Sequence, residues 1–127
     1  MSKNDNRPLS PHLEIYDLPM TAKLSVLHRG TGAALTVGLI LLVIALAAAA
    51  GGESSWNSMQ AHLSSWYGYF VLFGLTATLY YHFCNGIRHL LWDMGKGLEK
   101  VDQKQWGTIV LAATGVLTCL TWVIALL

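Results

Sequence analysis

Two histidines seven residues apart, His82 and His89, lie in a stretch rich in apolar side chains. On a helix this spacing places both imidazoles on one face, with Gly86 between them. An imidazole in an apolar segment needs a polar partner, and neutral imidazole is the commonest metal ligand in proteins. His82 is therefore a candidate functional residue, although a hydrogen bond between helices would also account for it. Gly86 could open a flat surface beside the ring or serve only close helix packing.

The same spacing excludes a shared role for the two histidines at one iron. Residues seven apart on a helix are separated by about 10 Å along its axis, whereas two axial ligands approach iron from opposite faces of the porphyrin. If His82 binds the iron, the iron is five-coordinate or takes its sixth ligand from another chain. His89 could then contact a haem propionate or orient the residue that binds the iron. Asp93, four residues after His89, could orient that ring or cap the polar end of the helix.

A second polar group, Ser25, His28 and Arg29, occupies positions i, i+3 and i+4, so a helix presents all three side chains on one face. Haem propionates need cationic donors, and a quinone carbonyl that takes up electrons and protons needs hydrogen-bond donors near water. Ser25 and Arg29 suit both requirements. An arginine at a membrane edge is also a common topology signal or snorkelling side chain, and that alternative stays open for Arg29.

Apolar runs indicate the elements that position these residues. Of the 127 residues 54% are hydrophobic and 12% charged, where soluble domains carry roughly 25% charged residues. Residues 30–52, 54–87 and 105–127 contain no Asp, Glu, Lys or Arg. The sequence predicts an all-α integral membrane bundle of three transmembrane helices, at about 30–52, 66–90 and 105–127. Residues 30–127 then form the membrane domain, and residues 1–29 an N-terminal arm.

Basic residues set the expected orientation. Four precede the first predicted helix, four lie between Arg88 and Lys104, and the loop between the first two helices holds Glu53 as its charged residue. The positive-inside rule then places the N-terminal arm in the cytoplasm and the C-terminus in the periplasm. Three prolines break the arm into turns, which leaves a short amphipathic piece at about Met20 to Arg29.

The sequence argues against a nucleic-acid partner, a covalently attached haem and a cleaved targeting segment. A net charge of +1 offers no basic excess for a nucleic-acid partner. Cys84 and Cys119 form no C-x-x-C pattern, and without C-x-x-C-H any haem is held non-covalently. The first apolar run starts too far along the chain, and is too long, for a usual signal peptide. An Arg-rich transit peptide is also absent, which favours the bacterial inner membrane.

Two long motifs resemble a known family. RPLSPHLEIYDLPMTAKLSVLHRGTG (Arg7 to Gly32) and YHFCNGIRHLLWDMG (Tyr81 to Gly95) resemble, in this order, the two signatures of the cytochrome b subunit of succinate dehydrogenase. The RPLSPHL form resembles the branch shared by alphaproteobacteria and mitochondria. The segment from Gly51 to Ser65 and the last predicted helix show no motif of that family.

The resemblance implies a membrane-anchor subunit of succinate:ubiquinone oxidoreductase. It implies that His82 is an axial ligand of haem b, with the opposite ligand from a small anchor subunit. It implies that His28 and Arg29 lie by the haem propionates, and that Ser25 and Arg29 line a ubiquinone site completed by an iron–sulfur subunit and the small anchor. Succinate would be oxidised by a flavoprotein subunit, since this chain carries no flavin or succinate chemistry.

Two alternatives remain from the sequence. The chain could anchor a quinol:fumarate reductase, which runs similar machinery in the opposite direction. It could also be a haem-free structural anchor whose histidines only pack helices.

Overall fold

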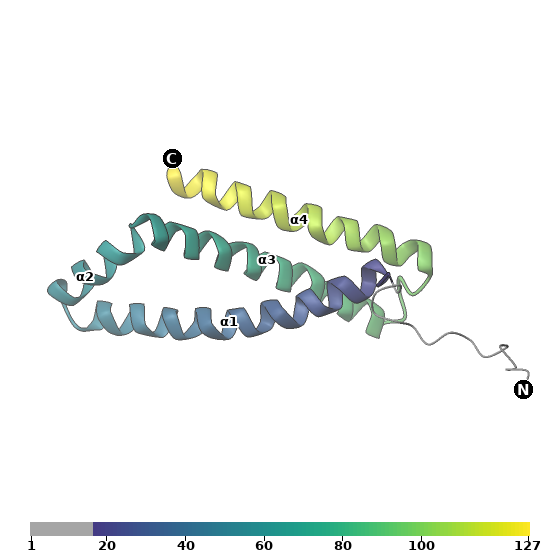
Figure 1. Cartoon of the computed structure of the whole chain (residues 1–127), viewed down its shortest axis with the longest axis horizontal. Coiled ribbons are helices and arrows are strands. Elements are labelled where there is room, and N and C mark those ends of the chain that lie inside the picture. The colour runs from purple at the N-terminus through teal and green to yellow at the C-terminus, as the bar shows by residue number, and fades with distance from the viewer. Residues whose placement is uncertain (1–16) are drawn as a thin grey trace, which may run out of the picture.

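The structure, a computed structural model, describes residues 17–127, and the regular elements within that range are all helices. They are α1 (Met20–Ala50), α2 (Glu53–Leu63), α3 (Trp66–Asp93) and α4 (Lys100–Leu126). Figure 1 shows α1, α3 and α4 as long rods side by side, with the short α2 joining α1 to α3 at one end. The all-α expectation is confirmed for this range. Residues 1–16 of the expected arm lie outside it, and they include residues 7–16 of the first family motif.

Helix α1 starts earlier than the sequence predicts. It runs without a break from Met20, just after Pro19, whereas a transmembrane helix was expected from about Gly30 with a separate amphipathic piece before it. No proline interrupts the chain between Met20 and Ala50, so the amphipathic piece continues directly into the apolar run. The 31 residues of α1 extend about 46 Å, more than the roughly 30 Å of a hydrocarbon core.

Helix α2 forms in a region where the sequence predicts no helix. Gly52 separates α2 from α1 with a φ of 96°, a backbone conformation that favours glycine. At the other end, the Ser65 hydroxyl accepts a hydrogen bond of 3.1 Å from the Gly68 N–H and caps α3. A Cβ atom at Gly68 would overlap the His62 carbonyl, so glycine is needed for this tight corner.

The turn between α3 and α4 is also built on glycine. Gly95 and Gly97 have φ values of 73° and 71°. The Trp92 indole N–H donates to the Gly97 carbonyl at 3.1 Å. The turn therefore brings the end of α3 close to the start of α4, at the end of the bundle opposite α2 (Figure 1).

The buried core is small and lies among the three long helices. It consists of Leu24 from α1, Tyr81 from α3 and Val110 from α4. The Tyr81 hydroxyl donates to the Leu24 carbonyl at 2.7 Å, which ties α3 to α1. A Cβ at Gly107 would lie 2.8 Å from Leu24 Cδ1, so glycine on α4 allows the close approach of α1.

Two of the described helices are long and apolar enough to cross a membrane, α1 and the part of α4 from Asp102 to Leu126. Buried residues make up 0% of the apolar window of α1 and 11% of that of α4, unlike a core helix of a soluble protein. Helix α3 is long enough but carries polar side chains, Asn85 and Arg88 among them, that lower its hydropathy. Large apolar side chains are nevertheless exposed along α3, among them Phe70, Leu79 and Phe83.

Candidate functional site

Three histidines from two helices gather between α1 and α3. The ring of His28 on α1 stacks on that of His82 on α3, with centroids 3.9 Å apart and planes 14° apart. The centroids of His28 and His89 are 5.1 Å apart, and their planes are tilted by 42°. The structure therefore brings these three rings into contact, which the spacing within each helix does not specify.

The Nδ1 atom of His82 is held by α1. It lies 3.2 Å from the His28 carbonyl oxygen and 3.2 Å from the Thr31 hydroxyl. A carbonyl oxygen can only accept, so the proton of a neutral His82 ring sits on Nδ1 and the lone pair on Nε2. The Thr31 hydroxyl itself donates to the His28 carbonyl at 2.8 Å. Metal-binding histidines are commonly oriented by such a contact on the other ring nitrogen.

Glycines fix how closely α1 approaches this ring. A Cβ at Gly32 would lie 3.2 Å from His82 Cε1, so α1 packs directly against the imidazole. Gly86, one turn after His82 on α3, would place a Cβ in open space. Gly86 therefore does not serve close packing against another described helix of this chain, because its side of α3 is open.

The other predicted site residues lie near the histidines without contacting them through hydrogen bonds. Ser25 is half-buried and Arg29 exposed, both on the first half of α1. Asp93 is exposed at the end of α3, and within residues 17–127 it makes no hydrogen bond to His89. His89 instead meets the Trp92 ring edge to face, with centroids 5.0 Å apart.

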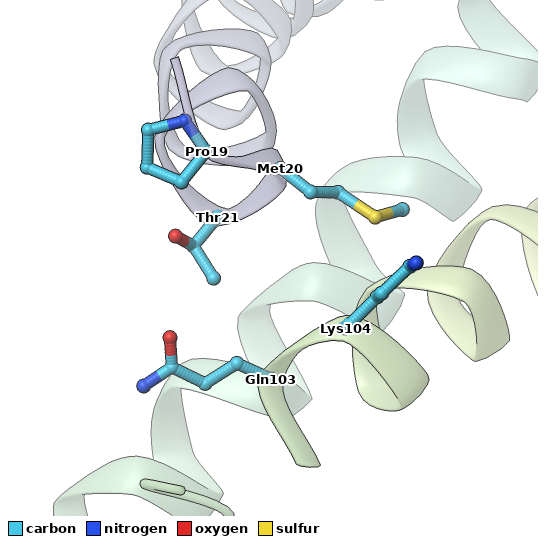
Figure 2. A pocket seen from close by; sticks show the side chains of 5 residues that line it. All are labelled: Pro19, Met20, Thr21, Gln103 and Lys104. Atoms are coloured by element: carbon cyan, nitrogen blue, oxygen red, sulfur yellow. The ribbon is translucent and has the colours of Figure 1, made fainter. Parts of the chain in front are cut away.

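A cavity of about 480 Å³ opens where α1 and α4 begin, at the same end as Ser25 and Arg29. Figure 2 shows its lining, in which Thr21 and Gln103 face each other across the gap and the Met20 side chain extends toward α4. The full lining is Pro19, Met20, Thr21, Gln103 and Lys104. The residues expected to contact quinone are not part of it.

Sequence reasoning missed two features of this end of the bundle. Thr31, buried beside His82, was not singled out, although its position three residues after His28 places it on the same helical face. Arg88 was counted among the basic residues that set the orientation, but it is buried, with 2% of its surface exposed. Its burial depends on how α3 packs against α4, which no spacing within one helix reveals.

These features define a helical membrane protein with a histidine cluster near one end of the bundle. Residues 3–121 match the family described as the succinate dehydrogenase/fumarate reductase transmembrane subunit, and the chain belongs to that family.

Similar proteins carry related names. The succinate dehydrogenase cytochrome b556 subunit of Paracoccus denitrificans is 38% identical over 119 residues, covering 94% of this chain and 92% of its own length. The cytochrome b560 subunit of Reclinomonas americana is 34% identical over 129 residues, covering 98% of this chain and 90% of the relative. The mitochondrial b560 subunit of Sus scrofa is 40% identical over 111 residues. That match covers 86% of this chain and 66% of the pig protein.

Proposed function

We propose that this chain is the membrane-anchor cytochrome b subunit of a succinate:ubiquinone oxidoreductase, binding haem b and forming part of the site of ubiquinone reduction. The observation that carries the proposal is the contact between His82 Nδ1 and the His28 carbonyl, which leaves Nε2 as the ligand atom. The names of the relatives point to the same role, because the Paracoccus and Reclinomonas proteins are called cytochrome b subunits.

The residues present fit a b-type haem. The His28 ring covers one face of the His82 ring, and a metal binds to the lone pair in the plane of the ring, so stacking does not block it. His28 Nδ1 is buried and has no hydrogen-bond partner, which leaves a donor for a propionate. His82 would hold the iron, and His28, Arg29 and His89 would lie around the propionates. When bound, the haem would supply a one-electron carrier close to the quinone.

Ser25 and Arg29 would act on the quinone. A partly reduced quinone carries negative charge on its oxygens, and a guanidinium with a hydroxyl one helical turn away stabilises that charge more than it stabilises neutral quinone. Arg29 is exposed and Ser25 half-exposed, so both can reach a ligand bound between this chain and a partner.

The proposed membrane placement has three spans, α1, α3 and α4, in the inner membrane of a bacterium. The third span is supported by the packing of α3 against both α1 and α4, the two helices apolar enough to span a bilayer. Two polar side chains of α3, Asn85 and Arg88, are buried, as a span that packs between other helices requires. Basic residues at the α3–α4 end favour a cytoplasmic arm and a periplasmic C-terminus.

Three partners follow from this role. A small anchor subunit would provide the second axial ligand, since geometry bars His89 from the same iron. An iron–sulfur subunit would deliver electrons to the quinone, and a flavoprotein subunit would oxidise succinate. The chain alone is not expected to oxidise succinate. The family description also names fumarate reductase, so an anchor of a quinol:fumarate reductase is the second candidate.

The test is to purify the chain from solubilised membranes through a tag and identify the chains that accompany it. A flavoprotein and an iron–sulfur protein, with succinate-dependent reduction of ubiquinone, are the expected result. A complex that accompanies the chain but only oxidises quinol with fumarate would favour the second candidate. Recovery of the chain without either partner would reject both.

A further inference from the structure

Two other rings pack against the imidazole of His89. Its centroid lies 5.1 Å from that of His28 and 5.0 Å from that of Trp92. Within residues 17–127 the half-buried His89 imidazole makes no hydrogen bond, so these ring contacts set its orientation there. The His28 ring in turn stacks on the ring of His82, the proposed haem ligand. His89 is therefore one ring away from that ligand.

Trp92 is fixed from within α3. It follows His89 by three residues and Arg88 by four, so the helix presents the three side chains on one face. The planes of Trp92 and His89 meet at 89°, the edge-to-face arrangement that aromatic pairs favour. Arg88 Cζ lies 4.1 Å from the centroid of the Trp92 ring, and Arg88 is buried. Because a desolvated cation attracts an aromatic face more strongly, this contact holds the indole in place.

The turn after α3 holds Trp92 as well. The Gly95 N–H donates to the Trp92 carbonyl at 2.8 Å, and the Trp92 indole N–H donates to the Gly97 carbonyl at 3.1 Å. Two hydrogen bonds and the guanidinium therefore restrict the Trp92 side chain to one rotamer. A side chain fixed in this way also restricts the His89 imidazole that packs against it.

We propose that Trp92 is a positioning residue, which holds the His89 imidazole in the orientation that directs it toward a haem propionate. This inference rests on the proposed function, because that function places His89 beside the propionates. Trp92 acts through His89 rather than on the haem itself. Without the indole, the imidazole is free to adopt other rotamers, and its hydrogen bond to a propionate is weakened.

Anchoring at the membrane surface is the alternative role, since tryptophan is common at the headgroup level of a bilayer. Trp106 at the start of α4 provides the comparison. Both indoles approach Gly97, where a Cβ would lie 3.1 Å from Trp106 Nε1 and 3.9 Å from Trp92 Nε1. Trp106 is exposed and, among the described residues, packs against no histidine ring. Anchoring predicts similar effects when either indole is removed, whereas positioning of His89 predicts an effect for Trp92 alone.

The first test is a redox titration of the haem in the purified complex. Trp92→Leu should lower the haem midpoint potential, because a propionate that loses its contact with His89 keeps more negative charge near the iron and favours the oxidised state. Trp92→Phe keeps a ring beside His89 but loses the hydrogen bond to Gly97, so it should show a smaller shift in the same direction. Trp106→Leu, the matched control, should titrate like the parent.

A double substitution shows whether Trp92 acts through His89. A His89→Ala complex has no imidazole left to position, so the addition of Trp92→Leu should lower the midpoint potential no further. Additive shifts would mean that Trp92 acts on the haem by another route, and they would overturn the inference.

Labelling with diethyl pyrocarbonate, read by peptide mass spectrometry, reports on the His89 ring whether or not haem is present. His89 should be modified severalfold faster in Trp92→Leu than in the parent complex, and at the parental rate in Trp106→Leu. The rate at His62, an exposed histidine on α2, should be the same in all complexes. If no b-type haem accompanies the complex, the proposed function fails, whereas this labelling still shows whether Trp92 holds His89.

A parental midpoint potential in haem-replete Trp92→Leu, or parental labelling of His89 in that variant, would overturn the inference. Equal changes in the Trp106→Leu control would do the same. If Trp92→Leu does not assemble, Trp92→Phe decides, because loss of the hydrogen bond to Gly97 should still loosen the ring. Parental values for Trp92→Phe would then overturn the inference.

Discussion

The Thr31 hydroxyl lies within hydrogen-bond distance of His82, the proposed haem ligand. It is buried, donates to the His28 carbonyl and lies 3.2 Å from His82 Nδ1. Removing a group that hydrogen-bonds to a metal ligand typically lowers metal affinity or activity about 10- to 100-fold. Thr31 therefore offers a way to disturb the ligand without deleting it.

Thr31→Val should keep the branched shape and remove the hydroxyl. We expect the variant to retain haem but to shift its midpoint potential and to release haem more readily in detergent. Thr31→Ser, which keeps the hydroxyl, should behave like the parent in a redox titration of the purified complex. Identical potentials in all three proteins would show that Thr31 serves only helix packing.

Arg29 and Ser25 are predicted to act on quinone rather than on succinate. Arg29→Leu should lower succinate:ubiquinone reductase activity by roughly tenfold or more, because a charge-assisted hydrogen bond to the reduced quinone is lost. Succinate oxidation with a soluble electron acceptor should stay near the parental rate. Ser25→Ala should show the same pattern with a smaller loss.

The control for these variants is Lys23→Leu, which removes an exposed cation six residues earlier on α1. Its quinone reductase activity should match the parent. If assembled, haem-replete Arg29→Leu and Ser25→Ala complexes also reduce quinone at the parental rate, the quinone site is built from partner chains.

Part of the site could be predicted from residue spacing. The seven-residue spacing of His82 and His89 and the i, i+3, i+4 spacing of Ser25, His28 and Arg29 follow from one helix at a time. The stacking of His28 on His82 depends on the rotation of α1 against α3, which no single helix encodes. The roles proposed for these residues stay predictions.

The helices themselves were predictable where apolar runs are continuous. The expected start at Trp66 coincides with the start of α3, and the last expected helix, about 105–127, overlaps α4, which begins earlier, at Lys100, and ends at Leu126. The polar segment that forms α2 has no apolar run, and its 11 residues are a length at which isolated helices are marginal, so its helicity depends on packing against α1 and α3.

Packing of α1 against α3 can be tested at Gly32. A Cβ there would lie 3.2 Å from His82 Cε1, so Gly32→Ala should push the ring and the two helices apart, at a cost of about 1–3 kcal/mol of stability. We expect a lower thermal midpoint of the purified complex and a changed haem spectrum. Gly30→Ala is the matched control, because a Cβ at Gly30 meets nothing within 4 Å. Equal midpoints for both variants would contradict the close contact at His82.

Residues 17–127, the part that the structure describes, have many more exposed than buried large apolar side chains. The buried hydrophobic core comprises Leu24, Tyr81 and Val110, while leucine, isoleucine, valine and phenylalanine side chains along the three long helices are exposed. Such a surface is stable only against lipid or partner helices. Arg88 is buried, whereas Lys96 and Lys104 are exposed at the α3–α4 end.

This charge asymmetry predicts that the C-terminus is periplasmic. A reporter that is active only in the cytoplasm, fused after Leu127, should therefore be inactive, and one that is active only in the periplasm should work. The reverse result would place Ser25, His28 and Arg29 on the side away from a partner that docks from the cytoplasm.

The central claim is that His82 ligates haem b in this anchor, and the reduced-minus-oxidised visible spectrum of His82→Ala tests it most directly. The variant should insert into the membrane, because it keeps every helix, yet lose most of the b-type signal. His89→Ala, the matched control on the same helical face, should keep the signal and show at most a shifted potential. A parental b-type spectrum in membrane-inserted His82→Ala would contradict the assignment of the ligand.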